Sequence, residues 1–269
     1  MPASYGLTYD WNHMSIFRLN LPLDKRNIMN RDNNTSESDV ATVAQLAIAH
    51  PAAAAIFEKY NIDYCCGGHR TLEEACERMG LDPAEVEQEI RNSKIEDVGH
   101  VLRTDSWSAS LLVDFIVQNH HAYVNDAIPL IKALLEKVCS VHGNDSLELL
   151  TIREDFLDLA DELTSHMQKE EFVLFPAIKR LESQSLVDHP LVHAIQSPIS
   201  AMEHEHTIAG DLVKHIRTLS NNYTPPSFAC PTFRTTYERL REFDNDLMRH
   251  IHLENNVLFE RMKTIGSSR

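Results

Sequence analysis

Two copies of a histidine followed four residues later by a glutamate stand out in the second half of the chain. They are His166 with Glu170 and His250 with Glu254. Side chains four residues apart lie on one face of a helix, so each pair can point at one spot. Imidazole nitrogens and carboxylate oxygens are both accepted as ligands by transition-metal ions. Each pair is therefore a candidate half of a metal site.

The residues around each pair predict a helix with one apolar face. Apolar side chains recur at alternating spacings of four and three over residues 152–177, where Val173 and Ala177 follow the first pair. The same spacing runs over residues 240–257 around the second pair. This pattern is typical of a helix packed in a bundle. Because the histidine and glutamate of each pair fall in the apolar face, the bundle would bury them.

The two helices belong to an internal repeat. His250 follows His166 by 84 residues, and the sequence Val-Leu-Phe recurs at the same offset. The helix before each pair also brings a lone histidine into its apolar face, at His121 and at His206. Packed antiparallel, two such units bring four imidazoles and two carboxylates together. The predicted ligand set is His121, His166, Glu170, His206, His250 and Glu254.

Six polar side chains in an apolar core are costly to bury without strong partners. A pair of metal ions is the simplest partner for four neutral nitrogens and two anionic oxygens. We expect two non-haem iron ions, each bound by two histidines and bridged by both glutamates. An oxo or hydroxo bridge and a small exogenous ligand fit the remaining positions. Manganese and then zinc are the alternative metals.

Three other histidines in these helices do not lie on the apolar face, because successive side chains of a helix point about 100° apart. We expect them at the surface or behind a ligand. They are His120, His204 and His252.

Two glutamates are candidates for orienting an imidazole or relaying protons. Glu162 lies one turn before His166, and Glu205 directly precedes His206. The alternative for each is a solvated charge on the helix surface.

Residues 1–38 are polar and irregular and predict a flexible extension, and residues 107–266 predict the four long helices. Between them, residues 39–95 predict a small all-helical module, followed by a linker over about 95–106. Ser38 or Asp39 is expected to cap the first helix of this module. The fold class is therefore all-α, with a small helical module followed by an antiparallel four-helix bundle.

The formal net charge of −15 makes nucleic acid and anionic membrane poor partners. No apolar run reaches the roughly 18 residues of a membrane span, and the start of the chain lacks a secretory signal. We therefore expect a cytoplasmic protein. Five cysteines are too few, and odd in number, for a disulfide framework.

The segment Asp63-Tyr-Cys-Cys-Gly-Gly68 interrupts the predicted helices of the module. Cys65 and Cys66 form a vicinal thiol pair on a turn, where metal docking or thiol exchange with a partner is possible. A tight turn with incidental cysteines is the alternative. Cys76, Cys139 and Cys230 are isolated, and we expect them to be structural.

The segment Asp63-Tyr-Cys-Cys-Gly-Gly68 resembles the N-terminal domain of the iron-sulfur cluster repair di-iron proteins. The segments beginning at Ser165 and His250 resemble the hemerythrin-like domain of that family. The resemblance covers the chain from about residue 40 to the end. It implies a hemerythrin-like bundle in a cytoplasmic, often dimeric protein, with a di-iron centre that has four histidine ligands and bridging carboxylates. The six predicted ligands match the family's ligands, and Cys65 and Cys66 match its cysteine pair.

The resemblance also implies a stress-response function, the restoration of iron-sulfur clusters damaged by nitric oxide or oxidants through delivery of labile iron. Damaged iron-sulfur proteins or cluster-assembly proteins would be the partners. Glu162 and Glu205 match acidic positions near the family's centre. Two alternatives remain, a nitric oxide reductase that needs a separate reductant, and a sensor that binds oxygen or nitric oxide reversibly.

Overall fold

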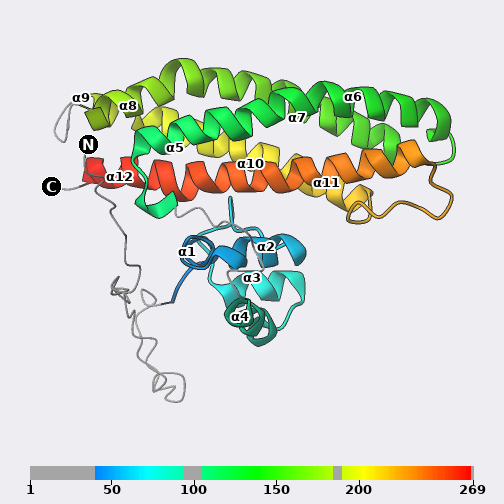
Figure 1. Cartoon of the computed structure of the whole chain (residues 1–269), viewed down its shortest axis with the longest axis horizontal. Helices are drawn as coiled ribbons and strands as arrows, with labels where there is room; N and C mark the ends of the chain where they lie inside the picture. Colours follow the sequence, from blue (N-terminus) through cyan, green and yellow to red (C-terminus); the bar gives the residue numbers. More distant parts are fainter. Residues whose placement is uncertain (1–39, 94–103, 184–189, 268–269) are drawn as a thin grey trace, which may run out of the picture. The chain divides into compact units, whose positions relative to one another are not determined.

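The computed structural model describes residues 40–93, 104–183 and 190–267. Over these ranges the chain is all-α, with a single isolated bridge between Thr42 and Thr71 in place of any strand, which confirms the predicted fold class (Figure 1). The predicted extension over 1–38 and most of the predicted linker over 95–106 lie outside the described residues. The description below concerns Ala41–Arg269, whose described residues belong to one compact unit.

Four short helices form the first part of this unit. They are α1 (Val43–Ala49), α2 (Pro51–Lys59), α3 (Leu72–Met79) and α4 (Pro83–Asn92). Helix α1 begins later than the sequence predicted, because Thr42 and Gln45 form a capping box in place of a cap at Ser38 or Asp39. The next two backbone amides, of Val43 and Ala44, donate to carbonyls of the segment before α3. These contacts fix the start of the helix.

Four long helical segments form the bundle, and three of them contain a π-helical stretch. After a 3₁₀ turn, η3 (Thr104–Ser106), the first segment comprises α5 (Ala109–Phe115), η4 (Ile116–His121) and α6 (Ala122–His142). The second comprises α7 (Glu148–Lys169), η5 (Glu170–Leu174) and α8 (Phe175–Ser183). The third is α10 (Gln196–Leu219), after the short α9 (Pro190–Ala194). The fourth comprises α11 (Pro231–His252), η6 (Leu253–Phe259) and α12 (Glu260–Ser267).

Helix α7 packs against both α6 and α10, and α11 packs against α6 and α10, so the four long helices surround one core (Figure 1). Apolar side chains fill that core, and Phe156 meets Phe243 edge to face across it. None of the described helices is long and apolar enough to cross a membrane.

The π-helical stretch η5 shifts the apolar face of the second segment by one residue. Val173 is 63% exposed, although the sequence spacing placed it in the core, and Leu174 is buried instead. One turn later Ile178 is fully buried, while Ala177 is only partly covered. A π turn contains an extra residue, because its hydrogen bonds span five residues rather than four. The predicted spacing is therefore wrong after Glu170.

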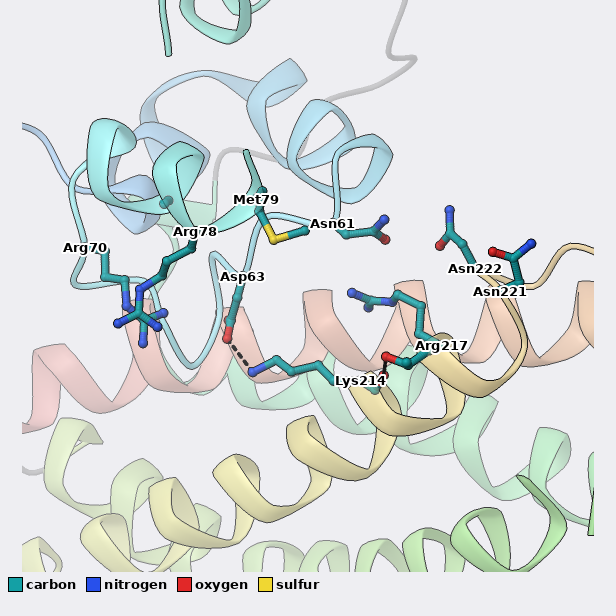
Figure 2. Close-up of a pocket in the computed structure, with 11 residues that line it drawn as sticks. Asn61, Asp63, Arg70, Arg78, Met79, Lys214, Arg217, Asn221 and Asn222 are labelled. Atoms are coloured by element: carbon teal, nitrogen blue, oxygen red, sulfur yellow. Dashed lines mark hydrogen bonds and ion pairs between the residues drawn. The ribbon is translucent and has the colours of Figure 1, made fainter. Parts of the chain in front are cut away.

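Ion pairs and a hydrogen bond join the short helices and the turn between them to the bundle. Arg249 of α11 donates to both carboxylate oxygens of Glu58 in α2, each at 2.7 Å. Lys214 of α10 donates to Asp63 at 2.7 Å, as Figure 2 shows. The side-chain amide of Asn256 donates to the carbonyl of Cys65 at 3.1 Å. These contacts bring the cysteine-containing turn against helices that carry predicted ligands.

Candidate metal centre

The structure brings all six predicted ligand residues together in the middle of the bundle. Each is at most 3% exposed. Their ligand atoms fall into two groups, and the atoms of each group lie within 4.8 Å of one another. The first group is His121, Glu170, His250 and Glu254, and the second is His166, Glu170, His206 and Glu254. The two glutamates thus belong to both groups.

The imidazole nitrogens face one another within each group. Nε2 of His166 lies 2.9 Å from Nε2 of His206, and Nε2 of His121 lies 3.2 Å from Nε2 of His250. Two ligands at right angles around one ion, each about 2.1 Å from it, are about 3.0 Å apart. The spacing of both histidine pairs therefore suits coordination of a shared ion.

The buried carboxylates lack the hydrogen-bond donors that they need. Both oxygens of Glu170 and Oε2 of Glu254 have no hydrogen-bond partner among the described residues. Nε2 of His206 lies 3.1 Å from Oε2 of Glu254, and Nε2 of His166 lies 3.3 Å from Oε1 of Glu170, both without the alignment of a hydrogen bond. The other oxygen of Glu254, Oε1, lies within hydrogen-bond distance of Nε2 of His250, at 3.0 Å. An ionised carboxylate in a dry interior is costly unless a cation compensates its charge. The residues of both groups therefore fit bound metal cations, with the two glutamates available to each group.

The electrostatics of the centre favour positive charge. Burial lowers the pKa of His121, but contacts with Glu170 and Glu254 outweigh it and raise this pKa to about 10. Burial likewise opposes charging of His166, yet Glu170 raises its pKa to about 9. Glu254 stays ionised, because neighbouring imidazoles outweigh burial and hold its pKa well below the usual range. A metal cation would occupy the same favourable field.

Three of the four imidazoles are oriented from behind, through Nδ1, by a further polar side chain. Glu171 lies 2.7 Å from Nδ1 of His121, and Glu205 lies 2.8 Å from Nδ1 of His166. Asn255 lies 2.8 Å from Nδ1 of His206. Such contacts fix the tautomer of the imidazole, so that Nε2 is free to bind a metal. The fourth, Nδ1 of His250, has no hydrogen-bond partner among the described residues.

The π-helical stretches explain two of these contacts. Glu170 and Glu171 are consecutive residues, yet they approach opposite nitrogens of the same His121 ring. Glu254 and Asn255 do the same to His206. An α-helix would separate neighbouring side chains by about 100°, whereas η5 and η6 widen the turn at these residues. Sequence reasoning missed Glu171 and Asn255, although the polar residue after the glutamate in each repeat was a usable signal.

Glu205 contacts a ligand imidazole, at the place where the sequence predicted an orienting carboxylate. Its other oxygen accepts from Lys169 at 2.7 Å. Glu162 is exposed and makes no hydrogen bond or ion pair with the described residues. The role suggested for Glu162 stays a prediction.

The three histidines set aside by their phase lie in different surroundings. His204 is exposed. His120 is buried, with its ring stacked on His250 at 5.5 Å and its Nδ1 3.0 Å from Asp246. His252 is buried beneath the short helices, where its ring meets Tyr64 edge to face at 5.1 Å. Of the two positions expected from the sequence, His120 lies behind the candidate ligand His250 and not at the surface. His252 is not at the surface either, because the module covers it.

The cysteine pair lies close to the candidate centre. Sγ of Cys66 lies 3.4 Å from the backbone carbonyl oxygen of His206. Sγ of Cys65 is buried, 3.2 Å from the sulfur of Met248. Asp63 joins the two cysteines in a third group whose atoms lie within 4.8 Å of one another. A pocket of about 410 Å³ is lined by both cysteines and by Asn255.

A second pocket, of about 560 Å³, is lined by Asp63 (Figure 2). Arg70 and Arg78 of the module line it together with Lys214 and Arg217 of α10. It is separate from the candidate ligands.

The fold and the paired histidine–glutamate groups define a hemerythrin-like class of protein. The hemerythrin HHE cation binding domain matches residues 113–262, which include all six predicted ligands. A domain of unknown function, ScdA_N, matches residues 39–94. The cation-binding character of the bundle thus agrees with the donor set found in it.

Curated relatives match most of the chain. It is 38% identical over 223 residues to the iron-sulfur cluster repair protein YtfE of Musicola paradisiaca, covering 82% of this chain and 95% of the relative. It is 39% identical over 222 residues to the proteins of that name from Shigella boydii and Escherichia coli O157:H7, covering 81% of this chain and 94% of each relative. The chain belongs to the family of YtfE iron-sulfur cluster repair proteins.

Proposed function

We propose that this chain repairs iron-sulfur clusters by supplying iron from a two-iron centre. The observation that carries the proposal is the pair of buried glutamates that belong to both four-residue groups and have oxygens without hydrogen-bond partners among the described residues. The names of the relatives supply the repair function. The proposed ligands are His121, His166, Glu170, His206, His250 and Glu254.

The chemistry of the ligands supports iron that is bound and yet releasable. Imidazole and carboxylate ligands protonate and exchange more readily than a cage of thiolates. Glu171, Glu205 and Asn255 fix the orientation of three imidazole rings, which keeps their Nε2 atoms aimed at the centre when iron is absent. The proposal includes an oxo or hydroxo bridge between the two ions, in addition to the bridging glutamates.

The proposal also gives the cysteine pair a role, to receive iron that leaves the centre. Cys66 touches the backbone of His206, and the pocket over the thiols is lined by Asn255, the side chain that orients the same histidine. Sulfur ligands accept iron, and the partly exposed Cys66 lies in the lining of the pocket, where a partner protein can reach it. We therefore assign Cys65 and Cys66 to the transfer step.

The proposed partners are damaged iron-sulfur proteins or cluster-assembly proteins in the cytoplasm. The proposal also includes the homodimer that the sequence resemblance implies. Light scattering of the purified chain measures the dimer directly, and a monomer at all accessible concentrations contradicts that part alone.

Iron transfer is tested with the iron-loaded chain and an apo iron-sulfur protein under anaerobic conditions, with sulfide and a reductant supplied. We expect two irons per chain at the start, an oxo-bridge absorption band in the oxidised form, and stoichiometric loss of iron as cluster absorption appears. Glu254→Ala should transfer no iron, whereas His204→Ala, on an exposed side chain, should transfer as the natural sequence does. One zinc, or no stoichiometric metal in a folded iron-replete sample, contradicts the centre.

The same sample separates the two alternative functions. Catalytic release of nitrous oxide from nitric oxide, with a supplied reductant and with iron retained, would identify a nitric oxide reductase. Reversible binding of oxygen or nitric oxide without iron loss or turnover would identify a sensor. Either result, together with failure of iron transfer, contradicts the iron-donor proposal.

A further inference from the structure

A thiol and an imidazole meet at the end of the bundle remote from the candidate metal centre. Cys230 immediately precedes α11 and His142 is the last residue of α6, with Sγ and Nε2 3.3 Å apart. Both helix ends lie at the right of the bundle in Figure 1. About 30 Å of helix separates Cys230 from His250 on α11. The pair therefore takes no part in the centre.

The surroundings of Cys230 favour its thiolate. The amides at the start of a helix carry partial positive charge and stabilise an anion placed there. The backbone amide of Phe233, then His142 and then the amide of Thr232, lower the pKa of the Cys230 thiol. Among these contributors His142 is the titratable side chain. A cysteine with an imidazole base in reach is the arrangement that activates thiol nucleophiles.

The other four thiols lack this combination. Burial raises the pKa of Cys76 and of Cys139. Contact with Cys66, together with burial, raises the pKa of Cys65. Cys66 is partly exposed like Cys230, but its sulfur contacts a backbone carbonyl and has no hydrogen bond to an imidazole among the described residues. Cys230 thus combines access with a basic neighbour, although its isolated place in the sequence suggested a structural role.

Aromatic rings hold the base in place. The His142 ring meets Phe233 edge to face at 5.6 Å and lies 6.4 Å from Phe228. Phe228 is 57% exposed and offers an apolar surface beside the thiol. A small organic disulfide can rest on this surface while one of its sulfurs approaches Sγ.

We propose that Cys230 is a modification site that undergoes exchange with low-molecular-weight disulfides, with His142 as its base. The imidazole takes the thiol proton, and the thiolate attacks one sulfur of a disulfide R–S–S–R. The S–S bond of the reagent breaks, the bond between Cys230 Sγ and one R–S group forms, and R–S⁻ leaves and is protonated. Cys230 is oxidised to the mixed disulfide while the leaving group is reduced to a thiol, so the electrons balance.

The test exposes the folded full-length chain to oxidised glutathione and follows adduct formation by intact mass, with peptide mapping of the site. We expect the first adduct on Cys230 and its loss in Cys230→Ser, with unchanged iron content. The matched control is Cys66→Ser, which should keep the fast adduct. His142→Gln keeps a polar side chain of similar reach and should slow the reaction severalfold.

The pH dependence of iodoacetamide alkylation at Cys230 separates activation from mere access. The profile of the natural sequence should rise at lower pH than that of His142→Gln, while circular dichroism shows both folded. A first adduct on Cys66, or a rate no faster than that of free glutathione, overturns the proposal. Identical rates and pH profiles for His142→Gln and the natural sequence overturn the role of His142.

Discussion

The first pair of long helical segments, which contains α6 and α7, and the second pair, which contains α10 and α11, present the same types of candidate ligand to the centre. The two pairs differ in what lies behind those ligands. Each pair supplies one histidine from its first helix and a histidine and glutamate four residues apart from its second. The distances between facing imidazoles, 3.2 Å and 2.9 Å, are similar. The arrangement of the six candidate ligands, called the cage below, is therefore nearly symmetric.

The side chains behind the ligands are not symmetric. Glu171 orients His121, whereas Asn255, which is 84 residues later, orients His206. Glu205 directly precedes His206 and bonds the ring of His166. The residue directly before His121 is His120, which stacks on a ligand ring instead of bonding its nitrogen. The two helix pairs thus use the same residue types as candidate ligands, whereas different residue types contact those ligands from behind.

A second difference lies farther from the centre. Asp244 of α11 is buried and accepts two hydrogen bonds from Arg217 and one from Tyr223. The residue 84 positions earlier, in α7, is Ala160, which is fully buried among apolar side chains. The two pairs thus reach a packed core by a polar network in one case and by apolar contacts in the other.

The largest effect is expected from removing either shared glutamate. Glu170→Ala and Glu254→Ala should each abolish stoichiometric iron binding, because each glutamate belongs to both groups. Iron per chain after anaerobic loading measures the loss, with circular dichroism to show that the helices remain. If one of the two variants still bound both irons, the two glutamates would contribute unequally to iron binding, although their positions are nearly symmetric.

The next largest effect is expected in the polar network of the second pair. Arg217→Met leaves Asp244 buried without its cation and should lower the free energy of unfolding by about 3–5 kcal/mol. Combining it with Asp244→Ala, the residue found in the other pair, should recover most of the loss. Urea denaturation of the metal-free chain measures both variants. A matched control is Lys132→Met at an exposed ion pair, expected within about 0.5 kcal/mol.

A smaller effect is expected from the residues that orient the imidazoles. Glu205→Ala should weaken iron binding by about 10–100-fold, because an oriented imidazole is a better ligand. Asn255→Ala should weaken iron binding less than Glu205→Ala does, because a neutral amide interacts with an imidazole more weakly than a carboxylate does. Competition with a chelator measures the affinities. Asp211→Ala, an exposed carboxylate on the same helix as Glu205, should leave them unchanged.

The smallest effect is expected at His120, the counterpart of Glu205. His120→Ala removes a ring stacked on His250 but no hydrogen bond to that ligand, so iron affinity should fall by less than about tenfold. The same chelator competition applies. A loss as large as that of Glu205→Ala would mean that both pairs depend equally on this position.

The meeting of the six candidate ligands was predictable from the sequence, because it depends on helical phase and residue type alone. His166 and Glu170 stand four residues apart in an apolar face, and the repeat at His250 and Glu254 confirmed the phase. The prediction that Val173 is buried fails, because the backbone changes to a π turn just before this residue. Nothing in local helix propensity distinguishes that turn from an α turn, because it is stabilised by the contacts that its residues make around the centre.

The buried positions of His120 and His252 were not predictable for a different reason. His252 is covered by Tyr64, 188 residues away in sequence, and His120 is held by Asp246 from another helix. Such contacts depend on tertiary packing, which the periodicity of a single helix does not encode.

The repeated helix pair carries an evolutionary consequence. One pair holds one histidine and one histidine–glutamate couple, which is half of the cage, and two identical pairs related by a twofold axis would complete it. A gene of half the bundle's length could therefore have encoded a functional ancestor that assembled from two copies. Fusion of two such genes would free each half to diverge, and the exchange of Glu171 for Asn255 and of Ala160 for Asp244 is what that divergence leaves behind.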